Sequence, residues 1–160
     1  MKGYENVINI AGLVVLIIMT GLSISDIRYK EIPQGGLCIL GGAAVIYQLI
    51  SWHQGVWNLF CVLGGIGVGV LFLVISRCTE EAIGYGDSIA ITILGAILGF
   101  WKSLEILSSA FFLCVIWTIV LSIFWKIRRK TLTKAIGTIP FMPFLTLGYA
   151  FLFIEYGGAL

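Results

Sequence analysis

The chain has 160 residues, of which 59% are hydrophobic and only 11% are charged, and its mean hydropathy is +1.05. Soluble domains carry about 25% charged residues, so this composition excludes an ordinary water-soluble enzyme and indicates an integral membrane protein. The net charge is only +2, and no nucleic-acid partner is expected. The length leaves no room for a separate soluble domain, so we expect a single transmembrane domain over residues 1–160.

A helix that crosses the bilayer needs about 20 apolar residues, each adding about 1.5 Å of rise. On this measure the chain divides into six apolar runs, and we expect an all-α, polytopic membrane protein with about six transmembrane helices. The runs cover approximately residues 6–25, 35–52, 56–76, 82–101, 104–125 and 139–156. Gly65 and Gly69 in the third run form a small-xxx-small pair, which we interpret as a helix-packing contact.

Most of the basic residues fall in loops on one side of these runs. The basic residues on that side are Arg28, Lys30, Arg77, Lys126, Arg128, Arg129, Lys130 and Lys134. Only Lys2 and Lys102 fall on the other side. The positive-inside rule therefore makes the richly basic side cytoplasmic and places both termini outside. We expect a multi-pass protein of the cell membrane, embedded in the lipid bilayer.

Two acidic residues lie at the end of their apolar runs that should face the cytoplasm. Asp26 ends the first run, and Asp87 lies a few residues inside the fourth, directly after Gly84-Tyr85-Gly86. An acid near the middle of a membrane helix costs on the order of 2.5–3.5 kcal/mol, so it usually has a function. The two glycines remove side chains and let a substrate backbone or a second helix come close. We therefore treat Asp26 and Asp87 as a candidate pair at similar depth.

The pair suggests a specific chemistry. Two carboxyl groups held close together cannot both ionise easily, so one stays protonated while the other is charged. This state suits peptide hydrolysis, because the charged acid takes a proton from water and the neutral acid donates one to the substrate. The four cysteines form no C-x-x-C pair and His53 is the only histidine, so we expect neither a metal site nor a cofactor.

Other interpretations of the same acids stay open. A small transporter or ion-pathway protein would also use Asp26 and Asp87, to bind a cation or to relay protons. Asp26 alone would fit a solvated acid at a helix end, paired with Lys30 four residues further on. We interpret Glu80 and Glu81 as interfacial or solvated side chains.

Three stretches resemble motifs of the type IV prepilin peptidases, a family of membrane aspartic proteases. The first, Asp26–Pro33, resembles the family's first aspartate followed by a basic loop and Ile-Pro. The second, Gly84–Asp87, fits the family's G-x-G-D motif. The third, Ile139–Leu145, is similar to the proline-phenylalanine segment that opens the family's last helix. The three stretches occur in the family's order, so the resemblance covers nearly the whole chain.

The resemblance implies an aspartic-type endopeptidase that removes the leader from prepilin-like or pseudopilin-like precursor proteins at the cytoplasmic membrane face. Asp26 and Asp87 would be the catalytic pair, and Gly84 and Gly86 would support the motif. Neither a metal nor a cofactor is implied.

The remaining features of the motifs refine this expectation. Arg28 and Lys30 follow the first aspartate and are interpreted as contacts to the substrate or to lipid. The chain resembles the short family members that lack an amino-terminal domain with C-x-x-C motifs, so methyltransferase activity is not expected. Many members carry a lysine two residues after the second aspartate, where this chain has Ile89. This departure keeps a third hypothesis open, a non-catalytic assembly partner built on the peptidase scaffold.

Overall fold

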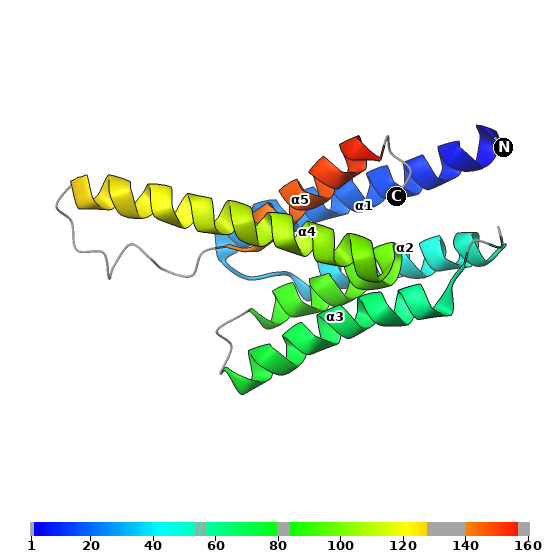
Figure 1. Cartoon of the computed structure of the whole chain (residues 1–160), viewed down its shortest axis with the longest axis horizontal. Coiled ribbons are helices and arrows are strands. Elements are labelled where there is room, and N and C mark those ends of the chain that lie inside the picture. The colour runs from blue at the N-terminus through cyan, green and yellow to red at the C-terminus, as the bar shows by residue number, and fades with distance from the viewer. Residues whose placement is uncertain (1, 54, 56, 80–83, 128–139, 157–160) are drawn as a thin grey trace.

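The computed structural model describes residues 2–53, 55, 57–79, 84–127 and 140–156. All the regular secondary structure in these residues is helical, which confirms the expected all-α class (Figure 1). The helices are α1 (Lys2–Tyr29), α2 (Gln34–His53), α3 (Leu59–Cys78), α4 (Tyr85–Ile127) and α5 (Met142–Glu155).

Four of these helices are long and apolar enough to cross a membrane: α1 over Ile10–Tyr29, α2, α3, and α4 over Tyr85–Phe124. Helix α5 is apolar but has only 14 residues. The boundary expected between the fourth and fifth apolar runs lies inside α4 rather than between two helices. The structure therefore supports a multi-pass membrane protein, and the count of about six spans stays a prediction.

Helix α4 is interrupted at Gly99, whose backbone has φ 77° and ψ −177°. This conformation is open almost exclusively to glycine, because a side chain on Cβ would clash with the neighbouring backbone. Figure 1 shows the green first part and the yellow second part of α4 running in opposite directions, so the chain turns back at this break. One glycine thus converts an uninterrupted apolar sequence into a helical hairpin.

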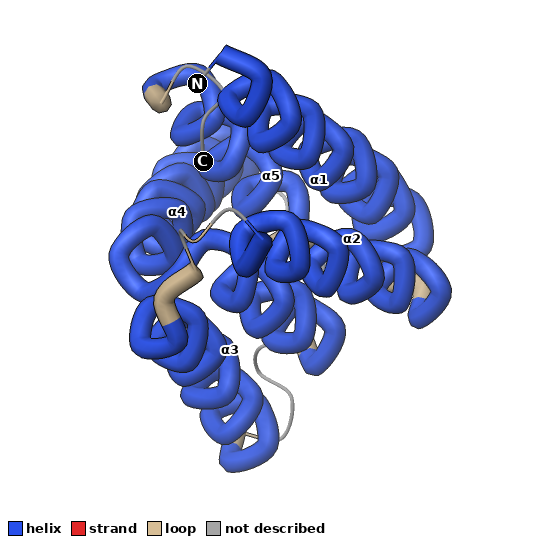
Figure 2. The backbone as a smooth tube through the Cα atoms, turned by 90° about the vertical axis from the view of Figure 1, so that its right-hand side faces the viewer, coloured by secondary structure: helices blue, strands red, loops and turns tan. Residues whose placement is uncertain are grey.

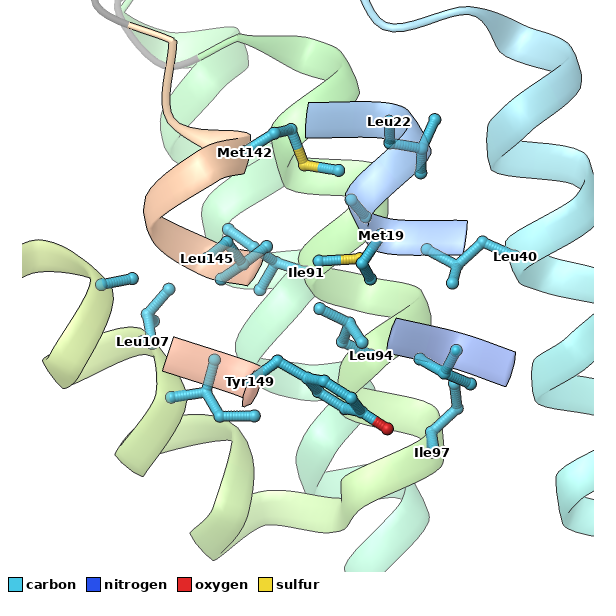
Figure 3. Close-up of a cluster of buried hydrophobic side chains, with 14 of the residues drawn as sticks. Met19, Leu22, Leu40, Ile91, Leu94, Ile97, Leu107, Met142, Leu145 and Tyr149 are labelled. Carbon is cyan, nitrogen blue, oxygen red and sulfur yellow. The ribbon is translucent and has the colours of Figure 1, made fainter. Parts of the chain in front are cut away.

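Helix α4 is also the centre of the packing. It contacts α2, α3 and α5, and α5 lies between α4 and α1 (Figure 2). The buried apolar side chains come from α1, α2, α4 and α5 and meet in one cluster (Figure 3). Met19, Leu40 and Tyr149 are fully buried in this cluster. Burial of such side chains fixes the positions of α1 and α4, the helices that carry the first two motifs, relative to each other.

Helix α3 approaches α4 most closely where glycines on α3 face the α4 backbone. A Cβ atom added at Gly65 would collide with the backbone of Gly95, and one added at Gly69 would collide with Thr92. The two helix backbones therefore touch at these positions, which only glycine permits. This contact confirms the helix-packing interpretation of the small-xxx-small pair.

The break at Gly99 generates a prediction. Gly99→Ala forces alanine into a conformation that costs about 1–3 kcal/mol, so the thermal unfolding midpoint of the detergent-solubilised protein should fall. Gly67 on α3 is the matched control, because a Cβ atom there would meet nothing within 4 Å. Gly67→Ala should leave the midpoint unchanged or raise it. Equal midpoints for the two variants would contradict the backbone assignment at Gly99.

Candidate active site

Asp26 lies inside the last turn of α1, because the helix continues beyond the expected end of the first run to Tyr29. Its side chain is buried, with only 6% exposed. The backbone N–H of Met142, the first residue of α5, donates a hydrogen bond of 3.2 Å to Asp26 Oδ2. The interpretation of Asp26 as a solvated helix-end acid is therefore wrong.

This hydrogen bond caps α5. The first N–H groups of a helix have no partner within the helix, and a negative group placed there is also favoured by the helix dipole. Phe141, the residue that precedes α5, provides no side-chain cap, so a carboxylate from α1 provides the acceptor instead. The contact joins the first and third motifs, because Pro143 lies in the first turn of α5.

Further polar contacts hold α5 against α1. Ser23 Oγ and Thr146 Oγ1 are hydrogen-bonded, and the single hydroxyl proton of Thr146 is shared between the carbonyl oxygens of Met142 at 2.9 Å and Met19 at 3.3 Å. One helical turn further on, the hydroxyl of Tyr149 donates to the carbonyl oxygen of Gly12 at 3.1 Å. These contacts run along α1 and α5 and fix the position of α5 relative to Asp26.

Asp87 lies in the first turn of α4 and is half-buried. Its Oδ1 atom is buried and has no hydrogen-bond partner among the described residues. A buried carboxylate oxygen without a partner is costly in a folded protein, so such an atom suggests a site that binds something polar. Water is the simplest group that would satisfy it.

The two glycines of the second motif are explained by the space around them. A Cβ atom added at Gly84 would lie 2.9 Å from Asp87 Oδ2, so a side chain there would displace the carboxylate. A Cβ atom added at Gly86 would lie 3.1 Å from the side chain of Ile32. Gly86 therefore lets the Ile-Pro end of the first motif pack against the second motif.

These contacts place the two acid-bearing motifs beside each other. Ile32 of the first motif touches Gly86 of the second, and Asp26 and Asp87 are close enough for a direct Coulombic interaction. No group of three or more His, Cys, Asp or Glu side chains in the described part of the chain could hold a metal ion. The arrangement is a pair of carboxyl groups at the start of α4 and the end of α1, beside the start of α5.

Arg28 and Lys30 are both exposed and lie outside the buried pair. Lys30 has φ 54°, in the left-handed region, and its N–H donates to the carbonyl oxygen of Asp26 at 2.9 Å. It thereby ends α1 and directs the chain toward Ile32, a role that its sequence position alone did not reveal. Glu80 and Glu81 lie outside the described residues.

The site also contains groups that the sequence did not identify. The N–H of Met142 holds Asp26, and the ring of Phe141 packs 5.2 Å from that of Phe111 on α4. The proline and phenylalanine residues of the third motif were the only signal for this contact. The donor is a backbone N–H, which every residue except proline has, so the sequence did not show which residue would donate to Asp26.

A comparison with known protein families matches residues 13–119 to the type IV leader peptidase family. The matched region contains both Asp26 and Asp87 and ends before α5. Comparisons with curated proteins and with solved structures found no match. The family match covers more than half of the chain and agrees with the motifs of the first two stretches. This chain therefore belongs to the type IV leader peptidase family.

Proposed function

We propose that this protein is a membrane-embedded aspartic endopeptidase that removes the leader from prepilin-like or pseudopilin-like precursors at the cytoplasmic membrane face. The observation that carries the proposal is the packing of the two acid-bearing motifs against each other, with Asp26 buried and Ile32 of the first motif beside Gly86 of the second. Membership of a leader peptidase family supports the class of reaction. The precursor class follows from the resemblance of the three motifs.

The contacts of the two acids suggest how they divide the chemistry. The Met142 N–H is hydrogen-bonded to Asp26 Oδ2, whereas Asp87 Oδ1 has no partner among the described residues and is the oxygen we assign to water or substrate. The ionised carboxyl group takes a proton from water, whose oxygen attacks the carbonyl carbon of the leader bond. The protonated carboxyl group first donates to the carbonyl oxygen. A proton then passes to the leaving amine as the C–N bond breaks.

The arrangement of helix ends supports the proposed orientation. Arg28 lies in the last turn of α1 and Arg77 in the last turn of α3. In Figure 1 these helix ends and the yellow end of α4 lie at one end of the bundle, opposite the N-terminal end of α1. Arg28 and Arg77, two of the basic residues that were expected to face the cytoplasm, therefore lie at the same end of the bundle. Asp26, in the last turn of α1, belongs to that end.

The orientation is tested with reporter fusions. A reporter inserted in the basic stretch 126–134 should report a cytoplasmic position, and one fused after Tyr156 an external position. The reason is the excess of basic residues on one side. The reverse pattern would place both aspartates at the wrong face for cytoplasmic leader removal.

The roles of the acids are tested by substitution. Asp26→Asn and Asp87→Asn should each reduce leader removal at least about 10²-fold, because an amide cannot exchange the protons that the reaction needs. Asn keeps an oxygen that accepts the Met142 N–H, so α5 should stay in place. The measurement is co-expression with a precursor that has a basic leader, a glycine and an apolar helix, and quantification of leader removal by mass spectrometry.

Glu105→Gln is the matched control, because Glu105 is an exposed acid on α4 away from the pair. It should cleave at the wild-type rate. If Asp26→Asn also cleaves at the wild-type rate, Asp26 serves only to cap α5 and the proposed pair is wrong. Absence of cleavage by the wild-type protein, with an ion-dependent flux instead, would favour the transporter hypothesis.

The glycines of the motif provide an independent test. Gly84→Ala should displace the Asp87 carboxylate by occupying the space 2.9 Å from Oδ2, and misplacement of a reacting group by about 1 Å can cost about 10²-fold in rate. Gly42→Ala on α2 is the control, because a Cβ atom there meets nothing within 4 Å. If Gly84→Ala cleaves precursor as fast as Gly42→Ala, the cleavage rate does not depend on the space that Gly84 leaves for the Asp87 carboxylate.

A further inference from the structure

A cavity of about 450 Å³ opens between the start of α2 and the start of α4. Ile32, Leu37 and Ile89 make its walls mainly apolar. Its volume falls within the range of about 300–1,000 Å³ that is typical of ligand pockets. The space is therefore large enough for more than one side chain of a bound molecule, and its chemistry favours an apolar one.

The cavity continues directly from the proposed catalytic site. Tyr85 and Gly86 of the G-x-G-D motif line it, and Asp87 is the next residue along the chain. Ile32, which touches Gly86, belongs to both the cavity and the first motif. A polypeptide whose carbonyl group reaches Asp87 therefore has this cavity beside it, within reach of a neighbouring side chain.

We propose that this cavity binds the apolar side chains that directly follow the cleaved bond of the precursor. The inference rests on the proposed peptidase function and adds a subsite to it. In an extended peptide each residue advances the chain by about 3.3 Å, so the cavity would receive a side chain within about two residues of the bond. A basic leader would not fit this space, because burial of its charges among apolar walls is unfavourable. The apolar segment after the bond has the matching chemistry.

Cys38 makes the inference testable, because its thiol lines the cavity and is exposed. Cys78, the last residue of α3, is also exposed but does not line the cavity, so it is the matched control thiol. The first protein retains Cys38 and carries Cys61→Ala, Cys78→Ala and Cys114→Ala. The second retains Cys78 alone. Each labelled protein is compared with its own unlabelled form.

The first measurement is the effect of labelling on cleavage. Benzyl methanethiosulfonate attaches a benzylthio group to the remaining thiol as a mixed disulfide, with release of methanesulfinate, and should lower cleavage by the Cys38 protein at least tenfold, chiefly through a higher KM. Reduction with dithiothreitol should restore the rate. The same label on the Cys78 protein should change its rate less than twofold.

The second measurement is protection of the thiol by peptide, made with Asp87→Asn added so that the peptide stays intact. The probe is a synthetic peptide with a lysine-rich leader, a glycine and a leucine-rich segment. A matched peptide has serine in place of each leucine. The leucine peptide should slow labelling of Cys38 at least fivefold, whereas the serine peptide should not. Neither peptide should slow labelling of Cys78.

The outcomes separate the subsite from the peptidase function. Suppose that the unlabelled Cys38 protein cleaves precursor, that the benzyl label does not slow this cleavage, and that the leucine peptide does not slow labelling. The subsite is then wrong and the peptidase function stands. If the leucine peptide protects Cys38 but no precursor is cleaved, the cavity binds apolar peptide and the peptidase function is wrong. If Cys38 reacts more slowly in lipid vesicles than in detergent and peptide has no effect, an acyl chain occupies the cavity and the subsite is overturned.

Discussion

The hydrogen bond from the Met142 N–H to Asp26 gives a partner to two polar groups of an apolar bundle, a buried carboxyl group and the first N–H of a helix. A buried carboxylate is unfavourable without a donor, and the start of a buried helix is unfavourable without an acceptor. Asp26 of α1 and the first residue of α5 satisfy each other at 3.2 Å. The position of α5 and the orientation of the Asp26 carboxylate therefore depend on the same bond, and the contacts of Thr146 and Tyr149 along the helix pair reinforce it.

Glycine provides the second constraint, because it determines how closely separate segments approach. Gly84 leaves room for the Asp87 carboxylate, and Gly86 lets Ile32 pack against the start of α4. Gly65 lets the backbones of α3 and α4 touch. The site is thus positioned by the absence of side chains as much as by their presence, and each of these glycines acts at a different contact. Asp87 keeps a buried oxygen that has no hydrogen-bond partner in the part of the chain that the structure describes.

Much of this arrangement was predictable from the sequence, for physical reasons. Apolar runs of about 20 residues must become helices in a bilayer, since their backbone groups have no other partners there. Asp26 and Asp87 stood out because acids are costly in such runs. The reversal of α4 at Gly99 was placed a few residues too late, because hydropathy does not reveal backbone conformation. The Met142–Asp26 bond was not predictable, because it joins a backbone group to a side chain that is distant in the sequence.

In the proposed mechanism Asp26 and Asp87 act on one water molecule. A crystallographic or cryo-electron-microscopy map that resolves ordered water at the ends of α1 and α4 would test it most directly. We expect one water within about 2.5–3.0 Å of a carboxyl oxygen of each aspartate. Two aspartates that bind separate waters, with no water common to both, would contradict it and leave Asp26 as a cap for α5 alone.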